Sequence, residues 1–294
     1  MAAINENSVR ESKPFLLFRQ TSEVGLKCSI DLSKLFPDEK DRNKFQNNFK
    51  KFCESQPAFC KIIQACESDL TYQSEQLIPS KKDNRPPGLF VFGNPATHSI
   101  NSGMFFSSEG KNGGEHRFWK SILPTAGIDD LNLKGIREEG ERNQQRLRAL
   151  LELSYKAPIR IGLCVLISFP SAASGDYSGI QGVKRLFGSK AMAELVKYEN
   201  ERVLSVIKEF LAPNGAVFTF HSDAWSGLKR YQDSVYDISK AMAGRLEGRV
   251  AEMPEIRLFG LPPTRLSGPA GEVLKKFLSE IEREMVPEKR QAFK

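Results

Sequence analysis

The chain has 294 residues, 40% of them hydrophobic and 20 of them Phe, which is enough apolar material to build one large domain or two small ones. This composition excludes an intrinsically disordered protein. The 43 Lys and Arg residues outnumber the 36 Asp and Glu residues, and the resulting net charge of +7 is compatible with a polyanionic partner without by itself indicating one.

The N-terminal stretch 1–13 has no apolar segment flanked by basic residues, so it does not resemble a signal peptide. No apolar run in the sequence approaches the roughly 20 residues needed to span a bilayer. The five cysteines form no CxxC pair, and their odd number and spacing fit neither a disulfide framework nor a compact metal site. We therefore expect an intracellular protein, bacterial cytoplasmic or nuclear, that binds no metal, no cofactor and no membrane.

The N-terminal section shows a mixed pattern. Two strand-like runs surround a Glu-Val-Gly turn in residues 14–32 and predict a hairpin. Apolar residues recur at helical spacing over 38–70, which predicts a helix. The segment 79–88, "PSKKDNRPPG", is Pro-rich and basic and reads as a linker or surface loop. We therefore divide the chain into an N-terminal extension, 1–80, of a hairpin and a helix, and a main domain, 81–294.

Strand and helix patterns alternate after the linker. Short continuous apolar runs are typical of strands buried on both faces of a parallel sheet. The alternation predicts an α/β fold, a three-layer α/β/α sandwich with a mainly parallel four-stranded central sheet. The expected strands are 88–93, 159–170, 215–220 and 255–262, and the expected helices are 116–128, 137–155, 190–211, one starting at 221, and 268–284.

Loops at the carboxyl ends of such strands usually carry the site. The loop 93–107 contains Asn94, whose side chain offers both a donor and an acceptor, and phenylalanines that can stack on a planar ring. The loop 262–270 leads into a helix whose first amides can bind a phosphate. Taken alone, each loop is explained more simply as an ordinary turn or a Pro-rich surface connection.

Together the two loops resemble a known family. Asn94 follows Gly93 at the end of a strand, and Pro, Ser, Gly and Phe follow Asn94 at the family's distances, with Arg-Phe-Trp-Lys opening a helix about ten residues later. The matching residues are Gly93, Asn94, Pro95, Ser99, Gly103, Phe106, Arg117, Phe118, Trp119 and Lys120, then Leu261, Pro262, Pro263 and Thr264. Over roughly residues 88–285 the chain thus resembles the uracil-DNA glycosylase superfamily, most closely its mismatch-specific uracil- and thymine-DNA glycosylases.

The resemblance implies a monofunctional hydrolase of base-excision repair. Such an enzyme acts as a monomer on DNA, flips out uracil or a related deaminated or mismatched base, and cleaves its N-glycosidic bond. Asn94 would be the catalytic residue that holds the attacking water. The implied base-binding residues are Gly93, Pro95, Ala96, Phe106, Ser168 and Phe169, and the implied DNA-binding residues are Ser99, Lys111, Arg117, Thr264, Arg265, Leu266 and Ser267.

Departures from the family pattern leave other functions open. Ala96 replaces the Gly that usually follows Asn-Pro, no carboxylate occupies the Asn94 position, and no His lies in 262–268. These features favour a second hypothesis, a weakly active or inactive glycosylase-fold protein that binds nucleic acid or a nucleotide. A third hypothesis is an unrelated α/β nucleotide enzyme such as a phosphoesterase, although the chain has no GxxxxGK[ST] phosphate loop.

Overall fold

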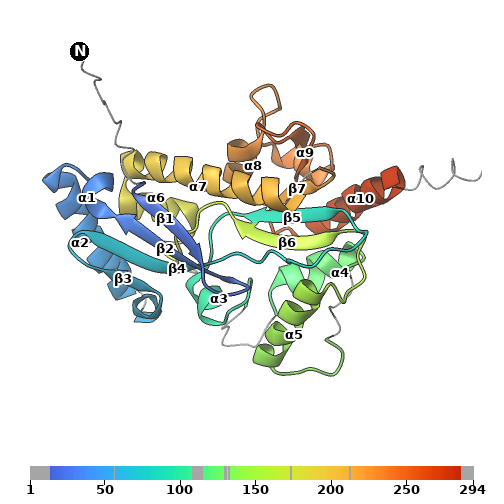
Figure 1. The fold of residues 1–294 in the computed structure, drawn as a ribbon, viewed down its shortest axis with the longest axis horizontal. Coiled ribbons are helices and arrows are strands. Elements are labelled where there is room, and N and C mark those ends of the chain that lie inside the picture. Colours follow the sequence, from blue (N-terminus) through green and yellow to red (C-terminus); the bar gives the residue numbers. More distant parts are fainter. Residues whose placement is uncertain are drawn as a thin grey trace, which may run out of the picture.

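The N-terminal section builds a sheet of its own in the computed structural model, which describes residues 14–55, 57–107, 115–128, 131, 133–172, 174–211 and 213–285. The sheet is antiparallel, with strand order β1-β2-β4-β3 (Figure 1). The predicted hairpin is confirmed, because β1 pairs with β2 along its whole length. The strands are β1 (Leu16–Gln20), β2 (Gly25–Asp31), β3 (Ile63–Ala65) and β4 (Asp69–Glu75).

The helix predicted over 38–70 is correct only in its first half. Helix α2 (Glu39–Ser55) buries Phe45 and Phe52, as its spacing predicts. The chain then passes through the short helix η1 (Pro57–Lys61) into the strands β3 and β4. Proline disfavours helical backbone in the residue before it, which explains why the helix does not continue. Ile63 pairs with Tyr72 across the sheet, so its place in the helical pattern was a coincidence of spacing.

The second sheet has five strands in the order β6-β5-β7-β9-β8. The first four are parallel and β8 is antiparallel, so the α/β class with a mainly parallel sheet is confirmed. The predicted count of four strands is wrong because β8 has only three residues and no apolar side chain to mark it in the sequence. The strands are β5 (Pro87–Phe92), β6 (Arg160–Val165), β7 (Ala216–Thr219), β8 (Glu247–Arg249) and β9 (Arg257–Gly260).

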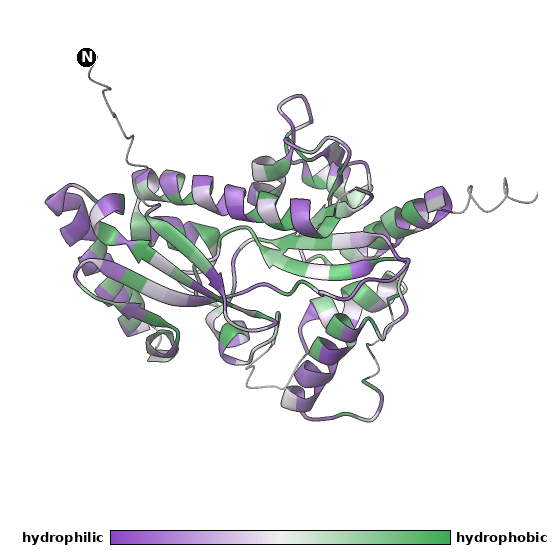
Figure 2. Ribbon diagram, in the orientation of Figure 1, coloured by the Kyte–Doolittle hydropathy of each residue, from purple (hydrophilic) through white to green (hydrophobic). Residues whose placement is uncertain are grey.

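Both faces of this central sheet are covered. Alternate residues of β5 point to opposite faces: Leu89 and Val91 join one apolar core, and Phe90 and Phe92 join the other. Figure 2 shows β5 and β6 apolar along most of their length, and amphipathic helices around them. The first core also contains residues of two helices, α7 (Ser189–Leu211) and α8 (Ser222–Leu228). The second core contains residues of four helices: η2 (Phe118–Ile122), α4 (Leu123–Thr125), α5 (Glu139–Glu152) and α10 (Ser267–Met285).

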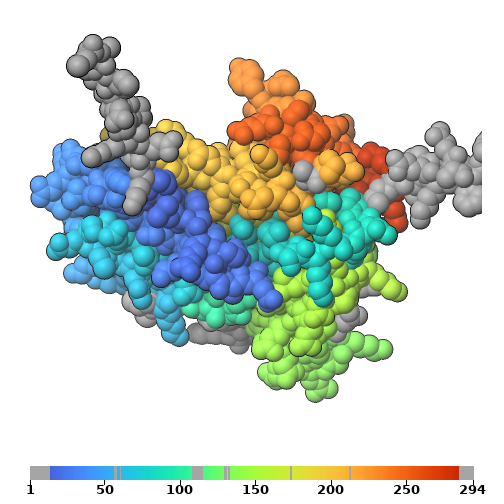
Figure 3. Space-filling model, viewed as in Figure 1, coloured from blue at the N-terminus to red at the C-terminus, as the bar shows by residue number. Residues whose placement is uncertain are grey.

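Helix α7 joins the two sheets. Its Tyr198 ring lies 4.4 Å from that of Phe15 before β1, and the guanidinium of Arg202 lies over the Phe18 ring. The same helix packs Val203 into the core that contains β5, so the N-terminal sheet shares a core with the central sheet (Figures 1 and 3). The remaining helices are α1 (Leu32–Leu35), α3 (Thr97–Asn101), α6 (Gly179–Phe187) and α9 (Ile238–Met242). None of the helices within the described ranges is long and apolar enough to cross a membrane.

Candidate functional site

The strand order indicates where a ligand site is expected, at one end of the strands of the central sheet. The chain leaves β5 toward β6 on one side and leaves β7 toward β8 and β9 on the other, so a ligand site is expected outside the carboxyl ends of β5 and β7. Gly93 follows β5 and His221 follows β7, and the two residues touch. A methyl group on Gly93 would lie 3.0 Å from Cδ2 of His221, so this position needs glycine for close approach rather than for its backbone angles.

Asn94 lies in a loop that is held by the loop after β6. The amides of Ile167 and Ser171 donate to the carbonyls of Gly93 and Pro95, at 2.9 and 3.0 Å. Between these two bonds, Nδ2 of Asn94 donates to the carbonyl of Phe169 at 3.2 Å. A carbonyl only accepts, so it fixes which end of the carboxamide faces it. Asn94 is half-buried, and this bond makes Oδ1 the acceptor end of the carboxamide that is turned away from the Phe169 carbonyl.

Phe106 belongs to a stack of two rings. Its backbone has φ +54°, an uncommon conformation for an aromatic residue, which the surrounding contacts must hold. The ring stacks on the imidazole of His116, with centroids 4.4 Å apart and planes 11° from parallel, and meets Phe92 edge-on at 4.7 Å. One face of the expected base platform is therefore covered by His116 in this conformation.

Two histidines near the carboxyl ends of the central strands are uncharged at neutral pH. Burial lowers the pKa of His116 to about 4, and the neighbouring charges of His98 and Arg117 lower it further. Burial also lowers the pKa of His221, against a weaker opposite effect of Asp223. In each ring Nδ1 accepts a backbone hydrogen bond, from Phe118 in His116 and from Asp223 in His221. The proton of each neutral ring is thus on Nε2, which makes both histidines hydrogen-bond donors at neutral pH.

The pKa of His116 predicts a measurable pH dependence. Between the ordinary value of 6.5 and about 4, the unfolded chain binds a proton at this position that the folded chain does not. Stability should therefore fall as the pH is lowered through this window, by up to about 3 kcal/mol from this residue. Urea unfolding at several pH values checks this, and His116→Gln should lose that part of the dependence. An NMR titration midpoint of His116 near 6.5 would contradict it.

The loop after β9 lies beside the first motif. Nη1 of Arg117 donates to the carbonyl of Arg265 at 3.2 Å, so these two predicted DNA-binding residues are brought together. The hydroxyl of Tyr236 donates to the carbonyl of Leu261 at 2.8 Å and steadies the start of the loop. Arg265 is exposed, and Ser267 begins helix α10, whose first amides face the same loop. Thr264 and Leu266 are half-buried there.

Four predicted site residues are buried instead, and Pro95 is one of them. Ser168 is fully buried and donates to Glu199, and the ring of Phe169 packs between Tyr72 and Phe187. Their side chains therefore do not line a base pocket; only the carbonyl of Phe169 reaches the site. Ser99 is buried in α3, which excludes its side chain from DNA contact in this conformation. Ala96 is half-buried and pairs with Ser171, and Lys111 lies outside the described residues.

A polar cleft of about 940 Å³ lies at the opposite, amino ends of the strands. Several arginines line it, but acids neutralise three of them, and one of these is Arg230, which pairs with Asp233 at 2.9 Å. Arg85 pairs with Asp83 at 2.6 Å, and Arg257 pairs with Glu284 at 2.8 Å. This compensation argues against a phosphate site there. In the part of the chain that the structure describes, no group of three or more His, Cys, Asp or Glu is arranged to hold a metal ion.

Sequence reasoning missed some residues that shape the site. Tyr236 carries no signal in the sequence, because its role depends on a contact with a loop 25 residues away. Glu199 did carry a signal in the sequence, because it lies four residues before Val203 on the apolar side of a helix. A charge at such a position needs a buried partner. No family model and no curated protein matches the chain, so the resemblance to the glycosylases depends on the motif residues of the sequence.

Proposed function

We propose that the chain is a monofunctional DNA glycosylase that releases uracil or a related deaminated or mismatched base from DNA. One observation carries the proposal: the carboxamide of Asn94 is oriented by the Phe169 carbonyl, at the carboxyl end of the central strands, where His221 also lies. An acceptor oxygen and a neutral imidazole donor then belong to the same end of the central sheet. Such groups can position a water and stabilise the charge on a departing base when no carboxylate is present.

In the proposed reaction the base leaves before water adds. The bond between C1′ and the base nitrogen breaks, and its electron pair leaves with the base. The Nε2–H of His221 donates a hydrogen bond to the negative charge that develops on the base. Because the imidazole is neutral, it stays protonated on Nε2 in this step. Oδ1 of Asn94 holds a water against the oxocarbenium-like sugar. The water adds to C1′ and gives its proton to the departing base.

The loops at the same end of the central sheet supply cationic side chains and backbone amides with which a monomer would bind DNA. The guanidinium of Arg117 lies against the backbone of Arg265, so both arginines belong to the same loop region, where they would neutralise phosphates on one strand. Leu266 follows Arg265 in the loop and would fill the space that the flipped base leaves in the stack. The amides at the start of α10 would donate hydrogen bonds to a further phosphate.

A second function, nucleic-acid binding without base release, is favoured by one observation. His116 covers a face of Phe106, so a base cannot stack on that face unless the imidazole moves. Ala96 adds a methyl group to the loop through which a base would approach. Both features lower catalytic capacity more than they lower the affinity of the basic edge for a phosphate backbone.

One experiment separates the two functions. Duplex and single-stranded oligonucleotides with uracil, a thymine mismatch, hypoxanthine or xanthine are incubated with the protein in the presence of EDTA, then heated in alkali and scored for strand breakage. Breakage at one of these bases supports the glycosylase. Binding in a gel-shift assay without breakage at any of them supports the second function. A loss of activity in EDTA would instead point to a metal-dependent nucleotide enzyme.

A further inference from the structure

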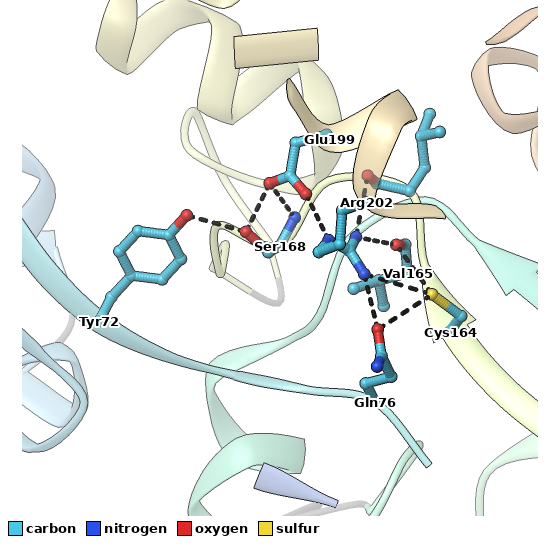
Figure 4. A network of polar contacts seen from close by, with 8 residues as sticks. Tyr72, Gln76, Cys164, Val165, Ser168, Glu199 and Arg202 are labelled. Carbon is cyan, nitrogen blue, oxygen red and sulfur yellow. Dashed lines mark hydrogen bonds and ion pairs between the residues drawn. The ribbon is translucent and has the colours of Figure 1, made fainter. Parts of the chain in front are cut away.

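A buried polar network lies behind the candidate site, outside the residues that the proposed reaction uses (Figure 4). Its centre is Glu199 on α7, with a relative exposure of 1%. Oε1 of Glu199 accepts two hydrogen bonds from Ser168, one from the amide at 2.6 Å and one from the hydroxyl at 2.5 Å. The same hydroxyl lies 2.8 Å from the phenol oxygen of Tyr72, on strand β4 of the N-terminal sheet.

The other oxygen of Glu199 is paired with an arginine. Oε2 lies 2.9 Å from Nε of Arg202, which is also buried. Arg202 in turn donates to the carbonyl of Val165 at 2.5 Å and to Gln76 at 2.9 Å. The network therefore ties the end of β6 to α7 and to the N-terminal sheet. Each charge has a partner, as a buried ion pair requires.

This network ends one residue from the contact that orients Asn94. Ser168 is fixed through its amide and its hydroxyl, and the next residue, Phe169, offers the carbonyl that accepts from Nδ2 of Asn94. The Phe169 ring is held as well, edge-on against Tyr72 at 4.8 Å. Tyr72 thus contacts Ser168 by its hydroxyl and Phe169 by its ring, and the main chain between them has little freedom to turn the carbonyl away.

We propose that Glu199, acting through Ser168 and supported by Tyr72, is a positioning residue that sets the orientation of the Asn94 carboxamide. The N-terminal sheet is then part of the active-site framework. This inference rests on the proposed role of Asn94 in base release. A carboxylate suits the task because its oxygen accepts from the amide and the hydroxyl of Ser168 together, while its other oxygen is held by Arg202.

The test is a double-mutant cycle between Ser168 and Asn94. Ser168→Ala removes the hydroxyl but keeps the amide bond to Glu199. We expect it to lower kcat for base release on the order of tenfold, with KM unchanged, because misplacement of a catalytic group costs rate rather than binding. In the Asn94→Ala background the same change should have no further effect. Ser205→Ala is the matched control: it removes a serine that bonds to Glu209 on α7, on the surface.

Two outcomes would overturn the positioning role: an unchanged kcat in Ser168→Ala, or an equal loss with and without Asn94. Tyr72→Phe is the second variant, because it removes only the phenol oxygen and should give a smaller loss of the same kind. The inference also has a readout without activity. The side-chain amide resonance of Asn94, assigned with Asn94→Ala, should shift in Ser168→Ala and stay in place in Ser205→Ala. If the wild type releases no base, the proposed function fails, and an unshifted resonance is the result that separately refutes positioning.

Discussion

Replacing Asn94 by Ala is expected to lower base release by about two to three orders of magnitude, the usual effect of removing one oriented polar group from a transition state. The side chain contributes through Oδ1, whose orientation depends on the bond from Nδ2 to Phe169. Without it the water is no longer held against the sugar. DNA affinity should stay within a few-fold, because the cations of Arg117 and Arg265 are untouched. Single-turnover release of uracil, with a gel-shift assay alongside, measures both quantities.

The matched control for this prediction is Asn101→Ala. Asn101 is an exposed asparagine in α3, seven residues along the same segment. Its replacement should leave both rate and affinity unchanged. Full activity in Asn94→Ala would remove Asn94 from the mechanism. A parallel loss of rate and DNA binding would assign Asn94 to binding instead of chemistry.

Replacing Glu199 by Ala is expected to destabilise the protein by about 3–5 kcal/mol, the usual cost of leaving a buried charge without its partner. Arg202 would remain at 8% exposure with no carboxylate beside it. Ser168 would lose the carboxylate oxygen to which its amide and its hydroxyl donate. The free energy of unfolding from urea titration measures the effect, with the midpoint and slope compared separately.

Helix α7 also supplies the control for stability. Glu194 and Lys197 form an ion pair with the same spacing, three residues apart, but their side chains are about half exposed. Glu194→Ala should change the free energy of unfolding by about 0.5 kcal/mol or less. The double variant Glu199→Met with Arg202→Met should recover much of the loss, because an apolar pair needs no partner charge. A loss below about 1 kcal/mol in Glu199→Ala would mean that water reaches Arg202 and that the network is not rigid.

The parts of the fold that the sequence predicted are those marked by long or strongly periodic apolar runs. Strand β5 appears in the sequence as "GLFVFG" because it is buried on both faces, and α7 and α10 carry an apolar side at helical spacing. The missed elements lack such a mark. β3 and β8 have three residues each, and the pairing of β3 with β4 is a contact between segments whose local pattern looked helical.

Some residues of the candidate site could likewise be predicted from the sequence, and others could not. Asn94, Phe106 and Arg265 could be proposed from residue type and spacing, because a polar residue after a buried strand and a basic residue in a Pro-rich loop are local features. The burial of Ser168 and Phe169 could not be predicted from the sequence, since it depends on how the N-terminal sheet and α7 pack over the end of β6. Nor could the ring of His116 on Phe106 be foreseen.

By itself, the sequence determined the α/β class, the strands of the central sheet except its short edge, and the segments that meet at one end of it. These follow from local hydrophobic periodicity, which every strand or helix carries within its own residues. Only the tertiary structure decided which end of the Asn94 carboxamide is bonded to the protein and what holds it there. That choice depends on a carbonyl of Phe169, on Glu199 from α7 and on Tyr72 from the N-terminal sheet. Contacts among such distant segments leave no local pattern, because they form only when all the segments are packed together.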